Sequence, residues 1–273
     1  MLARIMRLSS NTAWLAKLQL FVVLAMYSGN SNTSDYDQAT ALSDEIINIF
    51  STAQEFIFKN QSVINSSNPD KARLFGSRFL SDLRLIYKEL YDTDFPNTDH
   101  PIKSYLLTSM VAVMDDNRAL IMDDKLHYKG FIPAVFAFQL SQRFSNGGYP
   151  VSIKFVGFSD RSVNELNKPD PWEVKALNAM KSHSWSKSDT FHEVTRHSET
   201  NYLRTILPIY HNQQCLSCHG VLADNPRNKG KPRELWTVEN RAGFSMQNFK
   251  LNELAGGISL SIALESIHSQ SNQ

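Results

Sequence analysis

The sequence has few cysteines, no long basic run and no uninterrupted apolar run of the ~20 residues that a membrane-spanning helix needs. Only two cysteines occur in 273 residues, which excludes a disulfide-rich scaffold. Lysines and arginines are scattered, so we expect neither nucleic acid nor an anionic membrane surface as the main partner. We also find no internal repeat, which argues against a solenoid or a propeller.

The first 30 residues have the three-part layout of a secretory signal peptide. Its basic, apolar and small polar parts are Arg4, Arg7 and Lys17, then Leu18–Tyr27, then Ser28–Ser31. Removing this segment takes away three basic residues and no acidic ones, so the formal charge falls from +1 to −2. We therefore expect an exported, periplasmic protein; the alternative is an uncleaved N-terminal anchor that faces the periplasm. Residues 31–273 are expected to form a single domain with a helical N-terminal extension.

Both cysteines fall in one short motif, Cys215-Leu216-Ser217-Cys218-His219. This is the CxxCH spacing of c-type haem attachment. The two thiols, three positions apart, can add to the two vinyl groups of one porphyrin, and the adjacent imidazole can reach the iron from the proximal side. The motif therefore predicts one covalent haem c held by Cys215 and Cys218, with His219 as the proximal iron ligand.

Two other chemistries use similar residues. A thiol-disulfide redox centre also has a CxxC pair, but that pair usually opens a helix early in a βαβ unit, whereas this one comes late and follows a strand-like run. A structural zinc site needs four ligands, which Cys215, Cys218, His219 and His211 could supply, but the second paired knuckle of such modules is absent.

The first half of the chain has the apolar period of amphipathic helices. Apolar residues recur at spacings of three and four over 42–57, 74–90 and 106–114. Prolines at 69, 96 and 101 separate these segments. Met110 and Met114 fit core packing better than iron ligation.

The second half changes to the alternation of strands. Apolar and polar residues alternate over 151–155, 202–209 and 258–264, and a helix is expected from Trp172 to about residue 181. One antiparallel sheet with interposed helices predicts an α+β fold.

Several motifs, taken in order, give the chain a more specific resemblance. They are Gly130–Ala137, Asn167–Glu173, Tyr202–Arg204, Cys215–Gly220 and Gly256–Ser259. Over residues 40–265 the chain resembles the single-haem c-type sensor domain family, which has a PAS-like fold. The resemblance implies a PAS-like antiparallel sheet with long N-terminal helices, and a role as a free periplasmic protein or as the sensing part of a larger receptor.

The sequence departs from that family at two places. Some members supply a cysteine sulfur as the second iron ligand from the helical segment that is Ala134–Gln139 here, and this segment has no cysteine. No kinase or chemoreceptor region follows Leu264, so the resemblance implies a receiver that signals through a separate partner protein.

For the sixth iron position the candidates are His127, Met122, Lys129 and water. His127 is preferred because it directly precedes the matched segment that begins at Gly130. The histidines at 183, 192, 197 and 211 have polar neighbours and are expected in solvent-facing loops or strands. The stretch from position 225 to position 232 is expected to be a solvated loop.

Three further residues have a structural and a functional interpretation. We expect Trp172 to bury its ring against the sheet and Glu173 to complement the helix dipole, in preference to haem contact. Arg204 is a candidate partner for a haem propionate.

Three classes of function follow from a single haem. A redox or diatomic-gas sensor is favoured by the resemblance. A periplasmic electron-transfer cytochrome is the alternative, although one haem in so long a chain is bulky for that task. A haem enzyme such as a peroxidase ranks third, because no histidine-arginine pair marks a distal acid-base site. The oligomeric state is left open by the sequence.

Overall fold

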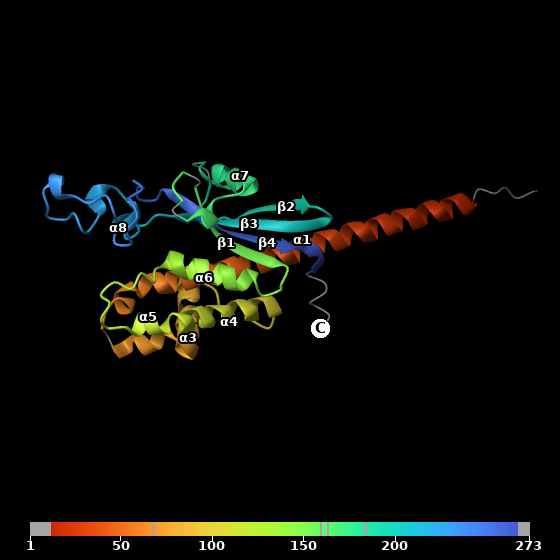
Figure 1. Cartoon of the computed structure of the whole chain (residues 1–273). Helices are drawn as coiled ribbons and strands as arrows, with labels where there is room; N and C mark the ends of the chain where they lie inside the picture. The colour runs from red at the N-terminus through yellow and green to blue at the C-terminus, as the bar shows by residue number, and fades with distance from the viewer. Residues whose placement is uncertain (1–11, 68, 159, 163, 183–184, 267–273) are drawn as a thin grey trace, which may run out of the picture.

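The structure is a computed structural model that describes residues 12–67, 69–158, 160–162, 164–182 and 185–266. Among the described residues six α-helices precede the sheet, and two more lie among the strands (Figure 1). Their bounds are α1 Thr12–Lys59, α2 Gln61–Ile64, α3 Gly76–Tyr91, α4 Pro101–Asp116, α5 Arg118–Met122, α6 Pro133–Ser145, α7 Pro171–Met180 and α8 Leu216–His219. The three helices predicted in the first half of the sequence are confirmed as parts of α1, α3 and α4.

Helix α1 provides the largest apolar face of the N-terminal layer. Its buried apolar residues recur mainly at helical spacing and are Ala39, Leu42, Ile46, Ile47, Ile49, Phe50, Ala53, Phe56 and Ile57. The first part of α1 extends beyond the rest of the molecule (Figure 1). No helix in the described part of the chain is both long and apolar enough to span a bilayer. The predicted signal segment lies partly in α1, and its first eleven residues are outside the described ranges.

Helices α3, α4 and α6 complete the N-terminal layer around α1. Met110 and Met114 of α4 are fully buried in the same core as α1, so the expectation that they pack in the core is confirmed. The Phe56 ring meets the Phe79 ring edge to face, with centroids 4.9 Å apart. These contacts join the helices in one layer.

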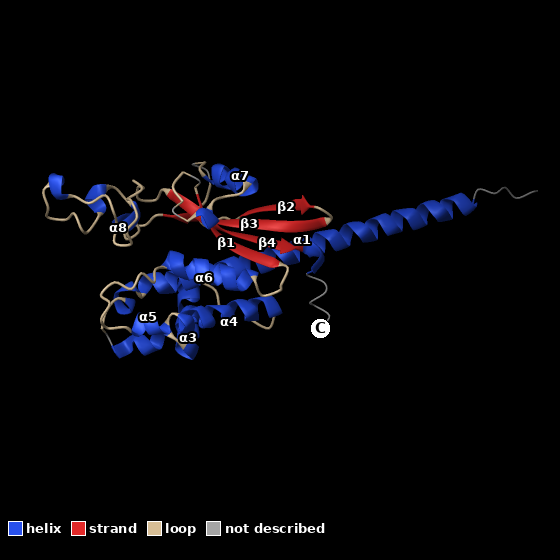
Figure 2. Cartoon of the chain, in the orientation of Figure 1, coloured by secondary structure: helices blue, strands red, loops and turns tan. Residues whose placement is uncertain are grey.

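The sheet has four antiparallel strands in the order β1-β4-β3-β2 (Figure 2). The strands are β1 Val151–Gly157, β2 Phe191–His197, β3 Thr200–Tyr210 and β4 Leu254–Ala263. Three of them are the predicted strands. Strand β2 was not predicted, because its residues have no apolar alternation and it pairs on one side only. The α+β class is confirmed.

Helices cover both faces of the sheet. Leu203 of β3 and Ile258 of β4 face α1 and α6, whereas Ile206 of β3 packs in a second apolar cluster with α7. A buried polar link also joins α1 to the sheet, since the Ser43 hydroxyl donates to Thr205 Oγ1 over 2.5 Å. The central strands β3 and β4 are therefore covered on both faces, and their polar residues Thr205 and Ser259 are buried as well.

The Pro-Trp-Glu segment at the start of α7 connects this helix to the sheet. Asp170 and Glu173 form a capping box, with each side chain bonded to the backbone of the other. Glu173 is 2% exposed and also pairs with Lys154 of β1 and Arg204 of β3, at 2.9 and 3.4 Å. The Arg204 guanidinium lies 4.2 Å from the centre of the Trp172 ring. The structural interpretation of Trp172 and Glu173 is confirmed, and Arg204 is held in this network.

We predict that Glu173→Ala lowers the free energy of unfolding by about 3 kcal/mol. The substitution removes the buried carboxylate that pairs with Lys154 and Arg204 and breaks the capping box of α7; Arg204 keeps only its pair with Asp170. Urea unfolding followed by circular dichroism measures this change. The matched control is Glu165→Ala, which removes an exposed carboxylate paired with Lys168 and should change the stability by less than about 0.5 kcal/mol. Equal stabilities of the two variants would contradict the assigned role of Glu173.

Candidate functional site

The CxxCH motif lies in a lobe that interrupts the hairpin of β3 and β4. The lobe begins at His211, directly after β3, and ends at Glu253, directly before β4. Its two ends are joined by backbone hydrogen bonds, from His211 N to Glu253 O at 2.9 Å and from Asn252 N to His211 O at 2.8 Å. Figure 1 shows the lobe, with α8 in it, at one end of the sheet. The sheet therefore fixes where the motif is presented.

One helical turn places the two cysteines on the same face. Helix α8 begins after Cys215 and contains Cys218, and residues three apart are neighbours on a helix. The Asn212 side chain prepares this turn, because its Oδ1 accepts hydrogen bonds from Gln214 N and Cys215 N at 3.0 Å each. Both cysteines are free thiols. Burial raises the pKa of the Cys215 thiol.

His219 is held by a returning segment of the lobe. Its Nδ1 lies 2.5 Å from Oε1 of Gln247, so the Gln247 carbonyl accepts from the Nδ1–H tautomer. Phe249 N donates to His219 O at 2.9 Å, and Asn240 Nδ2 donates to Cys218 O at 3.1 Å. The ring is thus oriented with Nε2 as the lone-pair nitrogen. Gln247 was not singled out from the sequence, since a glutamine in a loop has no distinguishing spacing.

Glycine follows the motif for a steric reason. A Cβ atom at Gly220 would lie 2.5 Å from an oxygen of the Asp224 side chain and 2.6 Å from the backbone oxygen of Leu216. Either distance is shorter than a side chain allows. The chain can therefore turn sharply after His219 only with glycine at this position.

His211 packs behind His219. Its ring centre is 5.4 Å from that of His219 and 4.2 Å from that of Phe249. Burial, together with the neighbouring His219, lowers the pKa of His211 to about 4, so its imidazole is neutral at pH 7. His211 is 6% exposed, and its Nε2 has no hydrogen-bond partner among the described residues. The expectation that His211 faces solvent was wrong, because the residue closes the base of the lobe.

Two other segments come near the motif from the helical layer. Burial raises the pKa of the Cys215 thiol, and the negative charge of the Glu55 carboxylate on α1 raises it further. Burial, and then the nearby Cys218, raises the pKa of the Tyr128 hydroxyl in the loop that follows α5. The end of α1 and the loop 123–132 therefore border the site on the side of the helices.

The candidates for the sixth iron position differ in how they are held. His127 is exposed and adjoins Tyr128, so it lies on the loop that borders the motif. Met122 is exposed at the end of α5. Lys129 is buried, and its Nζ donates to Leu126 O at 2.7 Å, so its ammonium group is already engaged. Among the described residues, no hydrogen bond or ion pair joins these side chains to His219, and the choice of His127 stays a prediction.

Two of the other histidines singled out from the sequence, His192 and His197, lie on β2 at the edge of the sheet. His192 on β2 is part of a polar cluster, with Nδ1 3.0 Å from Thr205 Oγ1 and Nε2 3.3 Å from Asp44 Oδ1. His197 is exposed at the end of the same strand, as expected. His183 lies outside the described residues.

The stretch from residue 225 to 232 is more ordered than the solvated loop that we expected. Asn225 and Asn228 are buried, and their side chains bond to the backbone of Glu239 and of Leu222 and Thr237. Asparagine side chains of this kind satisfy backbone groups where no regular secondary structure does so. The prediction was wrong for these two residues, and correct for the exposed positions between them.

The alternatives to haem attachment find little support in this geometry. A reactive disulfide centre lowers the pKa of its attacking thiol, whereas burial raises that of Cys215. Within the described residues, no group of three or more histidine, cysteine, aspartate or glutamate side chains lies close enough to hold a metal ion. A zinc site with His211 as the fourth ligand therefore has no observation in its favour.

The donor set fits a haem of the c type. Cys215 and Cys218 offer two free thiols on one face, and His219 offers an imidazole whose Nδ1 is already bonded. The buried, unpartnered Nε2 of His211 is a further polar atom without a protein partner at this place. Together these features describe a site that is built to receive an added group.

The fold and the site define an α+β protein with a helical layer on one face of a four-stranded antiparallel sheet and a CxxCH motif in the lobe between its last two strands. The model of the Tll0287-like family matches residues 30–263, and the chain belongs to this family. Among solved structures, the chain is similar to the crystal structure of the cyanobacterial heme-protein Tll0287. The sequence identity is 15%, the match covers 59% of this chain and 93% of that one, and the TM-score is 0.35. No curated protein matches the chain.

Proposed function

We propose that the chain carries one haem c and acts as a sensor of redox state or of a diatomic gas. The observation that carries the haem assignment is the geometry of the motif, in which two free thiols share one helical turn and Gln247 orients His219. Membership of the Tll0287-like family supports it, because the cyanobacterial protein Tll0287 is a heme-protein. Cys215 and Cys218 would hold the porphyrin covalently, and His219 would bind the iron from the proximal side. When bound, the haem supplies a one-electron couple and a binding position for a gas.

A sensor needs an element whose position depends on the state of the site. Helix α1 has the required placement, because Glu55 lies near Cys215 and the buried face of the helix packs on the sheet. Ser43 bonds to Thr205 of β3, so the same helix is also tied to the strand that leads into the motif. A change at the iron that moves the lobe would thus reach α1, which extends beyond the domain.

The remaining parts of the proposal come from the sequence. The signal-like segment at residues 1–30 supports export to the periplasm, with an anchored form facing the periplasm as the alternative. The sheet, with β1 next to β4, supports a PAS-like arrangement for residues 31–273. The output would pass to a separate signalling or redox partner protein. The molecule would not be an enzyme.

An electron-transfer cytochrome is the second candidate function. Cys218 and His219 are only partly buried, which leaves the motif near the surface of the lobe, and electron exchange requires such an accessible haem edge. The two functions differ at the sixth iron position. A carrier keeps two protein ligands in both redox states, whereas a gas sensor accepts an exogenous ligand.

We predict that His127→Ala converts ferric haem from low to high spin and raises its affinity for carbon monoxide in the ferrous form at least several-fold. The reason is that removal of a sixth ligand opens the iron to exogenous ligands. Optical and EPR spectra of the oxidised and reduced protein, with and without carbon monoxide, measure both changes.

His197→Ala is the matched control, because His197 is also exposed but lies at the end of β2. Its spectra should equal those of the wild type. Identical spectra and carbon monoxide affinities for His127→Ala and the wild type would remove His127 from the iron. Stable six-coordination of the wild type, with no gas binding, would favour electron transfer over gas sensing.

A further inference from the structure

Residues 225–241, within the lobe, form a loop with an excess of positive charge, which we call the cationic loop. Residues 31–273 carry a formal charge of −2, of which this loop supplies +3 and the remainder −5. Its cations are Arg227, Lys229, Lys231, Arg233 and Arg241, and its carboxylates are those of Glu234 and Glu239. Positive charge is therefore concentrated in the lobe, which lies at one end of the sheet (Figure 1).

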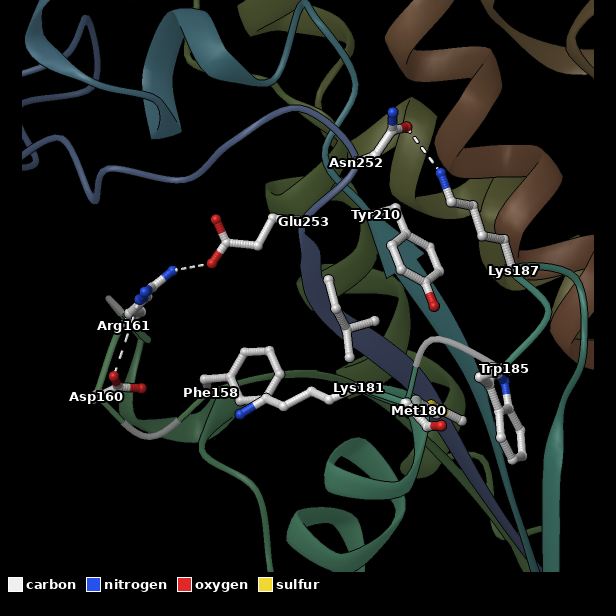
Figure 3. Close-up of a pocket in the computed structure, with 12 residues that line it drawn as sticks. Phe158, Asp160, Arg161, Met180, Lys181, Trp185, Lys187, Tyr210, Asn252 and Glu253 are labelled. Carbon is white, nitrogen blue, oxygen red and sulfur yellow. Dashed lines mark hydrogen bonds and ion pairs between the residues drawn. The ribbon is translucent and has the colours of Figure 1, made fainter.

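The five cations of this loop are exposed. Within the part of the chain that the structure describes, none of them forms an ion pair with a carboxylate. The base of the lobe differs, because there Arg161 Nη1 pairs with Glu253 Oε1 at 2.6 Å (Figure 3). Unpaired guanidinium and ammonium groups keep hydrogen-bond donors for the carboxylates of a partner.

Asn240 connects the cationic loop to the CxxCH motif. Its Nδ2 donates to Cys218 O at 3.1 Å, and its backbone oxygen accepts from Arg227 Nη1 at 3.2 Å. Arg241 is the next residue, on the turn that Asn240 begins. The two ends of the loop, each with an arginine, are thus held at the backbone of the motif.

The Arg241 side chain also borders the motif. Burial and then the Cys218 thiol raise the pKa of the Tyr128 hydroxyl, and the Arg241 guanidinium lowers it, so both groups lie near this hydroxyl. Cys218 would bond to a vinyl group, and the propionates of a haem lie on the edge opposite its vinyl groups. A cation beside Cys218 is therefore not placed to neutralise a propionate.

Apolar side chains are exposed in the same part of the lobe. Leu235, Val238 and Phe244 are 66%, 56% and 49% exposed. Phe244 N donates to Asn240 Oδ1 at 3.2 Å, so Phe244 belongs to the same turn as Arg241. Protein interfaces combine apolar and aromatic groups and arginine with a polar rim. These residues favour a protein surface over a small anion, which has no apolar area to bury.

We propose that the cationic loop is the docking surface for an acidic protein that exchanges one electron with the haem. The electron exchange rests on the proposed haem, whereas the docking does not. With a reduced iron–sulfur protein as the partner, one electron would leave the cluster and convert ferric to ferrous haem, and no covalent bond would change. Attraction between opposite charges speeds such an encounter and weakens as the ionic strength rises.

Stopped-flow reduction of the ferric full chain by reduced plant-type ferredoxin, an acidic [2Fe–2S] protein, tests the proposal. The lobe variant combines Lys229→Glu, Lys231→Glu and Arg241→Glu. Its matched control combines Arg78→Glu, Arg84→Glu and Lys88→Glu, three exposed positions on α3 in the N-terminal layer. The two variants have the same net charge, so a difference between them reports where the charge lies.

At low ionic strength the second-order rate constant should fall at least about tenfold in the lobe variant and less than about twofold in the control. At about 0.5 M salt, which screens exposed charges, both variants and the wild type should agree within about twofold. Equal rate constants for the lobe variant and the control at low ionic strength would overturn the proposal.

Carbodiimide cross-linking to ferredoxin tests the docking without any need for haem. The reagent joins lysine ammonium groups to carboxylates that touch them, and mass spectrometry of the joined peptides identifies the lysines. We expect cross-links at Lys229 and Lys231 that disappear at high salt, and none at Lys88, whose ammonium pairs with Asp94 at 2.7 Å.

The two measurements separate the possible failures. Cross-links at Lys229 and Lys231 in a chain that carries no haem would refute the proposed haem and support the docking surface. Cross-links confined to lysines outside the lobe, or none at low ionic strength, would overturn the docking surface. So would binding of the wild type to phosphatidylglycerol vesicles without cross-links to ferredoxin, because it would assign the cationic loop to a membrane.

Discussion

Replacing both Cys215 and Cys218 with alanine is expected to abolish covalent haem completely. Thioether attachment needs a sulfur atom for each vinyl group, and the chain has no other cysteine that could substitute. The wild-type chain, exported in a host with a c-haem assembly system, should keep its haem through heating in detergent. The double variant should lose all of it under the same treatment.

Haem-dependent peroxidase staining of denaturing gels measures this result. Ser217→Ala is the control within the motif. Among the described residues its hydroxyl bonds to the backbone oxygen of Gln214 and weakly to Cys218 Sγ, so the variant should stain like the wild type. An unstained wild-type band, in a host that attaches haem to a known c-type cytochrome, would refute the haem assignment itself.

The second large effect is expected from His219→Ala. The thioether bonds do not involve the imidazole, so the variant should retain covalent haem, whereas the iron should lose its native spin and coordination state. Optical spectra of the ferric and ferrous forms measure the change. An unchanged spectrum would exclude His219 as the proximal ligand.

Gln247→Leu is a milder substitution that tests the same imidazole, because it changes the hydrogen bond of His219 and keeps the ring. It removes the acceptor for His219 Nδ1–H and leaves Nε2 available. We therefore expect the iron to stay bound to His219 and the reduction potential to rise, because a histidine without a hydrogen-bond acceptor is a weaker donor to ferric iron. A spectrum like that of His219→Ala would instead mean that the ring cannot be placed without Gln247.

The parts of the fold that the sequence predicted are those in which one chemical pattern decides the structure. The period of α1 is visible because its buried residues repeat at three and four, and β1 is visible because Val151 and Ile153 alternate with polar residues. Strand β2 has no such signal. It lies at the sheet edge, where an exposed Val194 shares one face with His192 and Phe191 shares the other with Glu193, so side chains of both kinds occur on both faces.

The residues of the candidate site also differ in whether a sequence pattern reveals them. The two cysteines and His219 were found from the sequence because covalent attachment requires a fixed spacing. Gln247 and Asn240 were not, because their roles depend on a chain reversal. It brings Gln247 to the His219 side chain, 28 positions away, and Asn240 to the backbone of Cys218, 22 positions away. His211 was misplaced for a related reason: polar neighbours in sequence did not reveal that Phe249 covers its ring.

The joined ends of the lobe have a consequence for how it folds and how it can be moved. Closing a long flexible loop costs conformational entropy that grows with the logarithm of its length. Here the pairing of β3 with β4 offsets that entropy cost, because it brings Tyr210 opposite Leu254 and leaves His211 bonded to Glu253. The lobe is therefore an insertion whose two ends are already held together once the hairpin has formed. For this reason the unit from His211 to Glu253 is suited to transfer onto another antiparallel strand pair.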